Sequence, residues 1–300
     1  MVDLMVKKLL TGMGECMIEL SNAGEGLMKK SFAGDVVNTL WYARKALPVT
    51  WSTSFFTGLG EDKDSADMIS FLESAGIECA GILRIPDRNP GLYMIDLDQG
   101  ERSFSYWRDT SAAKLLASDP GRLEQVIDSA DALYVSGITM AILSEDHRDR
   151  LIGALGEARK AGKEVVFDSN IRPRLWENGD VMRQVLSRTA EVSSLVFPSF
   201  DDEAAVFGDR DVEATGARYG SNGALVVVKD GGRAVLTFQD GASQLFETEL
   251  VSAPVDTTGA GDSFNGAFLG DYLVSGDVAA SVRAGQTCAA HVIGHHGALV

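Results

Sequence analysis

The sequence predicts an α/β fold with a mainly parallel central sheet, and three observations carry this prediction. Short, continuous apolar runs alternate with longer stretches of helical period along most of the 300 residues. These runs are apolar at every position, as strands must be when helices cover both faces of their sheet. Three alternating runs between residues 14 and 107 predict a smaller antiparallel sheet with one exposed face. Since no linker or repeat divides the chain, we expect one domain over residues 1–300.

The elements of the main body follow from the same patterns. We predict strands at Asp131–Ser136, Glu164–Asp168, Ser194–Pro198 and Ala224–Lys229. We predict helices at Asp35–Ala46, Ala66–Ala75, Glu145–Ala161, Arg174–Thr189 and Gly261–Val274. The smaller sheet is expected from an alternating run at Gly14–Leu20 and from a hairpin whose strands are Gly91–Asp98 and Arg102–Trp107, with its turn at Gln99-Gly100-Glu101. We expect this sheet to form a lid from about residues 14–33 and 89–110.

Composition and charge exclude several classes of protein. The chain has 27 Lys and Arg against 43 Asp and Glu, a formal charge of −16, which argues against a nucleic-acid-binding protein. No stretch reaches the ~18 uncharged apolar residues of a membrane span, and the first ten residues lack the apolar core of a signal peptide. The three cysteines, Cys16, Cys79 and Cys288, have neither metal-binding nor redox-motif spacing and fit a reducing cytosol. We therefore expect a cytoplasmic, unanchored protein.

A glycine-rich segment near the C-terminus carries the most chemical information. It reads Val255-Asp256-Thr257-Thr258-Gly259-Ala260-Gly261-Asp262-Ser263-Phe264 and leads into a helix. Thr257 or Thr258 can cap that helix, and the glycines allow a tight turn that points several N–H groups at one spot, which makes an anion site. A lone carboxylate, Asp262, would repel a bound phosphate. It fits a site where a phosphoryl group is transferred and the carboxylate accepts the proton of the attacking hydroxyl. The alternative is a purely structural role, in which Asp262 is favoured at the helix N-terminus by the helix dipole.

The D-T-T-G-A-G-D-S-F string resembles the C-terminal signature of the ribokinase-like, or PfkB, carbohydrate kinases, and the resemblance covers essentially the whole chain. It implies ATP-dependent phosphoryl transfer to a sugar hydroxyl, with Asp262 as general base and the Gly259-Ala260-Gly261 backbone as the anion hole. It also implies a three-layer sheet-and-helix body with a small β lid. Competing motifs are incomplete: Gly12-Met13-Gly14 lacks the rest of a dinucleotide fingerprint, and the sequence contains no P-loop. We expect the four histidines to lie at the surface and not to form a catalytic triad or metal site. They are His147, His291, His295 and His296.

We expect substrate-binding residues at the start of the first predicted helix and at the end of the lid. Gly34 and Asn38 lie four apart on one helical face, and the family's early G-x-x-x-N element contacts substrate hydroxyls there. Asp35, in the same turn, either accepts a hydroxyl or caps the helix. Alternation sends Tyr106 and Arg108 to the same face, and an arginine beside a tyrosine is suited to a carboxylate, which a neutral sugar lacks.

A further arginine follows the buried strand that ends at Asp168, where open α/β sheets bind ligands. The pattern Asp168-x-Asn170-x-Arg172-x-x-Leu175-Trp176, together with Y-W-R-x-x-S-A-A from Tyr106, resembles the 2-keto-3-deoxygluconate kinase branch of the family. That resemblance implies that Tyr106 and Arg108 hold a sugar acid, that Tyr93 walls the site, and that Arg172 lies between substrate and ATP phosphates, with Asn170 on the nucleotide side. The alternatives are a surface salt bridge for Arg172 and lid packing for Tyr93.

The sequence motifs for the magnesium and nucleotide sites are less specific. Where many family members carry N-x-x-E, this chain has Ser199 and Asp202, so Asp202 is expected to order hydrated Mg²⁺ indirectly, with Glu203 as the other candidate. Lys229, Gly231 and Gly232 match the family's glycine turn near the ATP phosphates, although an ordinary hairpin turn explains them equally well. A helix at Ala279–Ile293 is expected to wall the adenine.

Taken together, the residues and the resemblance predict an ATP- and Mg²⁺-dependent kinase that converts 2-keto-3-deoxygluconate to its 6-phosphate. A kinase of a neutral sugar, a fructokinase or ribokinase, is the alternative, and a non-catalytic sugar or nucleotide sensor is the remote one. We expect partners to be a sugar acid and ATP, with no nucleic acid and no membrane. The lid, a small sheet with exposed edges, is also a candidate surface for a homo-oligomer.

Overall fold

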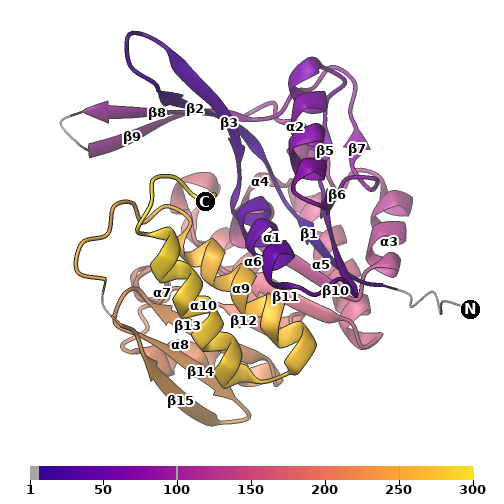
Figure 1. Ribbon diagram of the computed structural model, residues 1–300. Helices are drawn as coiled ribbons and strands as arrows, with labels where there is room; N and C mark the ends of the chain where they lie inside the picture. The colour runs from indigo at the N-terminus through magenta and orange to yellow at the C-terminus, as the bar shows by residue number, and fades with distance from the viewer. Residues whose placement is uncertain (1–6, 99–100, 250) are drawn as a thin grey trace, which may run out of the picture.

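A nine-stranded sheet organises the computed structural model, which describes residues 7–98, 101–249 and 251–300 (Figure 1). Its strand order is β15-β14-β13-β12-β11-β10-β1-β4-β6, parallel throughout except for the antiparallel pairs β13–β14 and β14–β15. The strands are β1 (Lys8–Met13), β4 (Trp51–Phe56), β6 (Ile77–Glu78), β10 (Ala132–Ser136), β11 (Glu164–Asp168), β12 (Leu195–Phe197), β13 (Leu225–Asp230), β14 (Ala234–Gln239) and β15 (Ala242–Glu247). The predicted α/β class is therefore confirmed.

Helices cover both faces of this sheet. They are α1 (Asp35–Ala46), α2 (Lys63–Ser74), α3 (Pro120–Ser129), α4 (Gly137–Ile142), α5 (Glu145–Lys160), α6 (Gly179–Glu191), α7 (Phe200–Phe207), α8 (Val212–Tyr219), α9 (Ala260–Ser275) and α10 (Val278–Val292), with short 3₁₀ turns at Ala112–Leu115, Pro173–Leu175 and Gly220–Asn222. In the described residues, no helix is long and apolar enough to cross a bilayer.

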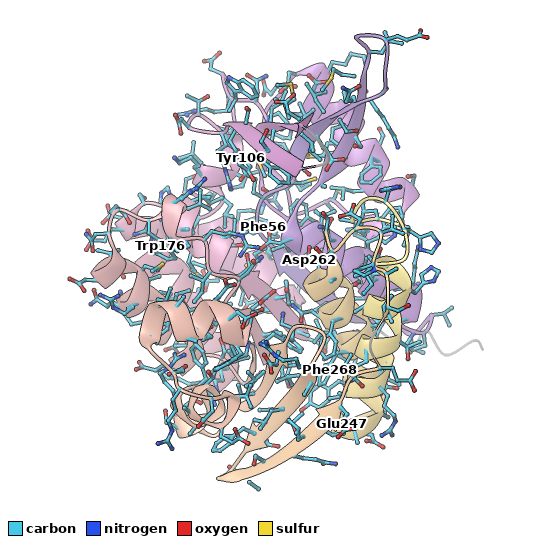
Figure 2. All side chains as sticks on the ribbon, turned by 90° about the vertical axis from the view of Figure 1, so that its left-hand side faces the viewer. Phe56, Tyr106, Trp176, Glu247, Asp262 and Phe268 are labelled. Carbon is cyan, nitrogen blue, oxygen red and sulfur yellow. The ribbon has the colours of Figure 1, made fainter. Side chains whose placement is uncertain are left out.

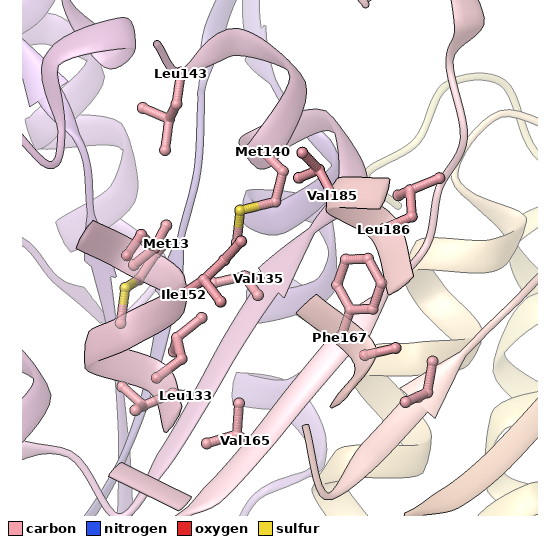
Figure 3. Close-up of a cluster of buried hydrophobic side chains, with 14 of the residues drawn as sticks. Met13, Leu133, Val135, Met140, Leu143, Ile152, Val165, Phe167, Val185 and Leu186 are labelled. Atoms are coloured by element: carbon pink, nitrogen blue, oxygen red, sulfur yellow. The ribbon is translucent and has the colours of Figure 1, made fainter. Parts of the chain in front are cut away.

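Two hydrophobic clusters, one on each face, hold the layers together. Along β10, Leu133 and Val135 belong to the cluster under α3–α8, whereas Tyr134 belongs to the cluster under α1, α2, α9 and α10. Figure 3 shows the first cluster, with Phe167 beside the side chains of α6. This alternation explains why the strands are apolar at every position, since each face is buried.

A second, four-stranded sheet projects from the body (Figure 1), in the order β3-β2-β8-β9. Its strands are β2 (Met17–Asn22), β3 (Met28–Ala33), β8 (Leu92–Asp98) and β9 (Glu101–Trp107), while β5 (Gly58–Leu59) and β7 (Leu83–Arg84) form a separate short pair. The predicted separate small sheet is confirmed, with β2 beginning at Met17 rather than Gly14. It is not wholly antiparallel, because β2 and β8, which the chain connects through the body rather than by a hairpin, pair in parallel. Of its predicted hairpin turn, Gln99 and Gly100 lie outside the described residues.

Two predicted helix starts are wrong, because side-chain caps set them. The helix expected from Arg174 begins at Gly179: Pro173 opens a 3₁₀ turn instead, and the Asn178 side chain accepts the N–H groups of Asp180 and Val181. The helix expected from Ala66 begins at Lys63, because the Asp62 carboxylate accepts the N–H of Ser65.

Helices α1 and α9 lie against each other, which brings together segments more than 200 residues apart. Gly266 and Gly270 of α9 make this contact possible: a Cβ at Gly266 would lie 2.4 Å from the Thr39 carbonyl oxygen, and one at Gly270 would lie 2.2 Å from the Ala46 Cβ. The close packing carries the first turns of both helices to the same end of the sheet.

Candidate active site

The first turn of α9 is built around Gly259, which adopts the left-handed conformation with φ 77°. Gly259 is the N-cap and no side chain caps the helix, so the predicted threonine cap is wrong. The physical reason is that the Thr258 hydroxyl and N–H both donate to Asp256 Oδ1, at 2.7 and 3.0 Å. No side chain therefore occupies the backbone N–H groups at the start of α9.

The amides of this turn are not equivalent. The N–H of Ser263 donates to the Gly259 carbonyl at 2.8 Å, and that of Ala260 donates to the Thr257 carbonyl at 3.3 Å. Gly261 and Asp262 occupy the second and third helical positions, where N–H groups have no acceptor within the helix. The positive end of α9 and these two amides are suited to bind an anion. The anion site at Gly259–Gly261 stays a prediction, in which the Ala260 amide is already used by Thr257.

Asp262 stands beside that anion site and is held by a residue of α1. Its Oδ2 accepts a hydrogen bond of 2.8 Å from Asn38 Nδ2. Burial, and next the charge of Asp35, raise the pKa of Asp262 to about 7, while the Asn38 hydrogen bond and the charge of Lys229 lower it. A carboxylate poised near neutral pH is suited to accept a proton from an attacking hydroxyl.

Behind Asp262 lies a buried polar network that sequence reasoning missed. Lys229 Nζ donates to Asn265 Oδ1 at 3.1 Å and lies 3.4 Å from Asp168 Oδ1. Asn265 Nδ2 in turn donates to Asp168 Oδ2 at 2.8 Å and to the Tyr134 hydroxyl at 3.1 Å. The sequence holds two signals for this network, the position of Asp168 at the end of one predicted strand and that of Lys229 at the end of another, but none that the two meet. The network fixes Lys229 at the end of β13, facing the α9 turn.

Asp35 does not cap α1, because Gly34 is the N-cap and no side chain caps the helix. Instead, Asp35 Oδ2 accepts a hydrogen bond of 2.8 Å from Asn170 Nδ2. Asn170 itself has φ 28°, a conformation that non-glycine residues rarely adopt, and its N–H donates to Asp168 Oδ1 at 3.3 Å. The loop after β11 is thus tied to the start of α1.

Three cavities run in sequence across this end of the sheet. The central cavity, of about 400 Å³, contains Asp262, the Gly259–Gly261 turn and Asn170. The α10 cavity, of about 490 Å³, shares Asp202, Lys229 and Gly261 with it. The second-sheet cavity, of about 840 Å³, shares Asp35 and Arg172 with it. The shared residues make one groove with Asp262 at its middle.

The second-sheet cavity gathers most of the predicted substrate residues, among them Gly34, Tyr106, Arg108 and Arg172. Figure 2 shows Tyr106 on the second sheet, above the body that carries Asp262. Tyr93 does not line this cavity: its ring packs 5.9 Å from that of Tyr106, and its hydroxyl donates to Glu19. Asn38 likewise contacts Asp262 rather than lining the second-sheet cavity.

The residues of the chain match one family along nearly their whole length. The model of the pfkB family carbohydrate kinases matches residues 7–300. The chain belongs to this family. It is 36% identical over 304 residues to the 2-dehydro-3-deoxygluconokinase of Escherichia coli strain K12, with 98% of each chain covered, and 36% identical over 305 residues to that of Dickeya dadantii, covering 99% of this chain and 98% of the relative.

The fold of this pfkB kinase is also found in solved structures. An Escherichia coli protein described as a candidate ribokinase II, solved with ATP and Mg²⁺, superposes with a TM-score of 0.83 at 22% identity, covering 98% of this chain and 94% of that one. The ribokinase-like architecture predicted from the sequence is therefore confirmed.

The α10 cavity of the pfkB kinase is lined by several residues that the sequence predicts to bind the nucleotide. Gly231 and Gly232, in the β13–β14 hairpin turn, lie on its wall, so the hairpin and the glycine-turn interpretations describe the same residues. Ala289 and Ile293, at the end of α10, give it an apolar side suited to a flat base. Lys229 and Gly261 stand where it meets the central cavity.

Asp202 is the carboxylate that fits a magnesium role. It lines both the α10 and the central cavities, its side chain is 42% exposed, and it lies 3.7 Å from Arg172 Nη1. Glu203, the other predicted candidate, points away: it is fully buried and pairs with Arg218 at 2.8 Å and the Tyr219 hydroxyl at 3.0 Å. Within the described ranges no group of three or more His, Cys, Asp or Glu side chains could hold a metal ion.

Proposed function

We propose that this pfkB kinase transfers the γ-phosphoryl group of ATP to the terminal hydroxyl of 2-keto-3-deoxygluconate, giving the 6-phosphate. This substrate is the one in the name of the relatives that are 36% identical over nearly the whole chain. The structural observation that supports it is the placement of Arg108 and Tyr106 in the second-sheet cavity, at the far side of Asp35 from the phosphoryl-transfer turn.

Arg108 is the residue of that cavity that favours a sugar acid. Arg108 can offer a planar pair of N–H donors to a carboxylate, and the Tyr106 hydroxyl stands on the same strand two residues away. A linear sugar acid whose carboxylate lies at Arg108 would extend its other end toward Asp35 and Asp262. A neutral sugar has no carboxylate for Arg108 to bind, so a fructokinase or ribokinase activity is the less favoured alternative.

The chemistry assigned to the chain itself is positioning and charge stabilisation. ATP would supply the phosphoryl group, with Mg²⁺ neutralising phosphate charge beside Asp202. Asp262 in its ionised form accepts the proton of the terminal hydroxyl. The amides of Gly261 and Asp262, with Lys229, face the anion side of the central cavity and stabilise the charge that develops there. Arg172 lines both the sugar side and the central cavity and would bridge them.

The experiment that tests this function is an ATP-consumption assay on a panel of acceptors. The panel contains 2-keto-3-deoxygluconate, its galactonate epimer, gluconate, fructose and ribose. We expect a kcat/KM for a keto-deoxy sugar acid at least a hundredfold above those for fructose and ribose. A preference for fructose or ribose would establish the neutral-sugar alternative, and no ATP consumption with any acceptor would favour a sensor.

The compartment and the assembly are part of this proposal. Cys16 and Cys79 are buried free thiols, which fits the reducing cytoplasm.

The second sheet exposes Phe104 and Trp107, and an exposed sheet with unpaired edges is suited to form a dimer with a second copy of the chain. A molecular mass in solution equal to one chain at micromolar concentration would contradict the dimer.

A further inference from the structure

Glu15 lies where the second sheet joins the body. It stands between β1, which ends at Met13, and β2, which begins at Met17. A Cβ at Gly34, where the chain returns from β3 to α1, would lie 2.2 Å from the Glu15 carbonyl oxygen. A Cβ at Gly91, where the chain enters β8, would lie 2.7 Å from Glu15 Oε1. Three of the connections between the two sheets therefore meet closely around this one residue.

The fourth connection meets it through an ion pair. Arg108, which follows β9, donates from Nη2 to Glu15 Oε2. The Glu15 side chain is 1% exposed and that of Arg108 is 12% exposed. Both residues line the second-sheet cavity. The guanidinium that is assigned to the substrate carboxylate is thus already held on one side by a buried carboxylate.

The Glu15 carboxylate is costly to bury in this way. Its Oε1 has no hydrogen-bond partner among the described residues, so only one of its two oxygens is compensated. An ion pair with a merely mechanical role does not need burial, as Lys30 and Asp64 show: they join β3 of the second sheet to α2 at a largely exposed site outside all three cavities. The burial of the Glu15–Arg108 pair at the cavity therefore indicates a role in ligand binding.

We propose that Glu15 is a positioning residue for the substrate: it takes one edge of the Arg108 guanidinium and thereby presents the remaining donors to the substrate carboxylate. An arginine has five N–H donors in a rigid plane, so fixing one nitrogen fixes the direction of the others. This inference rests on the proposed function, because it assumes that Arg108 binds a sugar acid. It adds a residue of the β1–β2 connection to the recognition of that acid.

The test compares two unbranched, uncharged variants of similar length. Glu15→Gln keeps an oxygen that can accept from Nη2, whereas Glu15→Met fills the same space without an acceptor. For Glu15→Met we expect the KM for the sugar acid to rise about tenfold, while kcat and the KM for ATP stay within twofold. For Glu15→Gln we expect a KM within threefold of the wild type. An unchanged KM in Glu15→Met, or an equal rise in both variants, overturns the proposal.

Two further variants separate positioning from loss of the second sheet's attachment. Lys30→Met removes both exposed ion pairs that join β3 to α2, with Asp64 and Asp67, and should leave the KM for the sugar acid unchanged. A rise equal to that of Glu15→Met would assign the effect to attachment alone. In an Arg108→Leu background, Glu15→Met should add nothing to KM, and an added rise would overturn the proposal. Should Glu15→Met fail to fold, Glu15→Asp replaces it, since it keeps the charge but withdraws the oxygens by one methylene and should give the same rise.

The same set distinguishes failure of this inference from failure of the proposed function. If Arg108→Leu alone leaves the KM for the sugar acid unchanged, the carboxylate assignment fails and the inference fails with it. If Arg108→Leu raises that KM and Glu15→Met does not, the proposed function stands and only the role of Glu15 is refuted.

Discussion

Asn38 Nδ2 donates a hydrogen bond of 2.8 Å to Asp262 Oδ2, although the two residues are 224 positions apart. The bond joins the first turns of α1 and α9, which glycines on α9 allow to pack closely. It stabilises the ionised form of Asp262 and so opposes the burial and the Asp35 charge that raise its pKa to about 7. The geometry of α1 therefore sets the pH at which the proposed base works.

Replacing Asn38 by leucine should shift the pH dependence of the reaction. Loss of a hydrogen bond to the charged form raises the pKa of Asp262, so less of the base is ionised at a given pH. The acid limb of the kcat/KM profile, expected near pH 7 for the wild type, should move upward. The activity loss should then be greater at pH 6 than at pH 9. Thr39→Val, which removes a neighbouring α1 hydrogen bond to Tyr134, should leave the limb in place.

Asp262→Asn should remove the proton acceptor while leaving both binding cavities intact. We expect kcat to fall on the order of 10²–10⁴-fold, the usual contribution of a general base. Dissociation constants for ATP and for the sugar acid, measured by calorimetry, should stay within threefold. Turnover at the wild-type rate would remove Asp262 from the mechanism.

The same substitution should stabilise the fold at alkaline pH. The pKa of Asp262 is raised from 3.8 to about 7, so between these values the folded state binds more protons than the unfolded state. The contribution of Asp262 to stability is therefore greatest at acidic pH and falls as the pH rises toward 7. Asp262→Asn lacks this loss and should exceed the wild type on the order of 1–3 kcal/mol at pH 8. Thermal unfolding should show the difference shrinking toward pH 5, and a constant difference would contradict it.

Arg108→Leu should separate sugar acids from neutral sugars. Loss of the guanidinium should raise the KM for the sugar acid at least tenfold, about 1.4 kcal/mol, and leave the weak activity on fructose unchanged. Steady-state kinetics with 2-keto-3-deoxygluconate and with fructose provide the measurement. An equal effect on both would show that Arg108 supports the second sheet rather than the carboxylate.

Gly259→Ala should damage the anion turn through backbone strain and a clash. Gly259 has φ 77°, and a Cβ there would lie 2.8 Å from the Cβ of Ala298 and 2.9 Å from its Cα. The strained conformation alone costs about 1–2 kcal/mol, and displacement of Ala298 adds to it. Gly276→Ala is the matched control, since Gly276 ends the same helix with φ 68° and has open space around it. We expect a larger fall in melting temperature and in kcat for Gly259→Ala, and equal effects would exclude the clash.

The sequence by itself determined the features that depend on neighbouring residues. Continuous apolar runs specify buried strands, because every side chain of such a strand meets a helix layer. The glycine turn before Asp262 specifies a helix start suited to an anion, because backbone conformation and the helix dipole are local properties. Side-chain caps at Asp62 and Asn178 are local too, and they start two helices at residues other than the predicted ones.

Only the tertiary structure decided which side chains meet. Lys229, Asp168 and Asn265 form one buried network because the carboxyl ends of β11 and β13 meet the N-terminal part of α9. Nothing in the three separate segments specifies that meeting. Glu15 holds Arg108 across 93 residues in the same way. A hydrogen bond or ion pair requires two groups within a few ångströms in a given orientation. Strand order and helix packing decide whether this condition is met, and both depend on contacts along the whole chain.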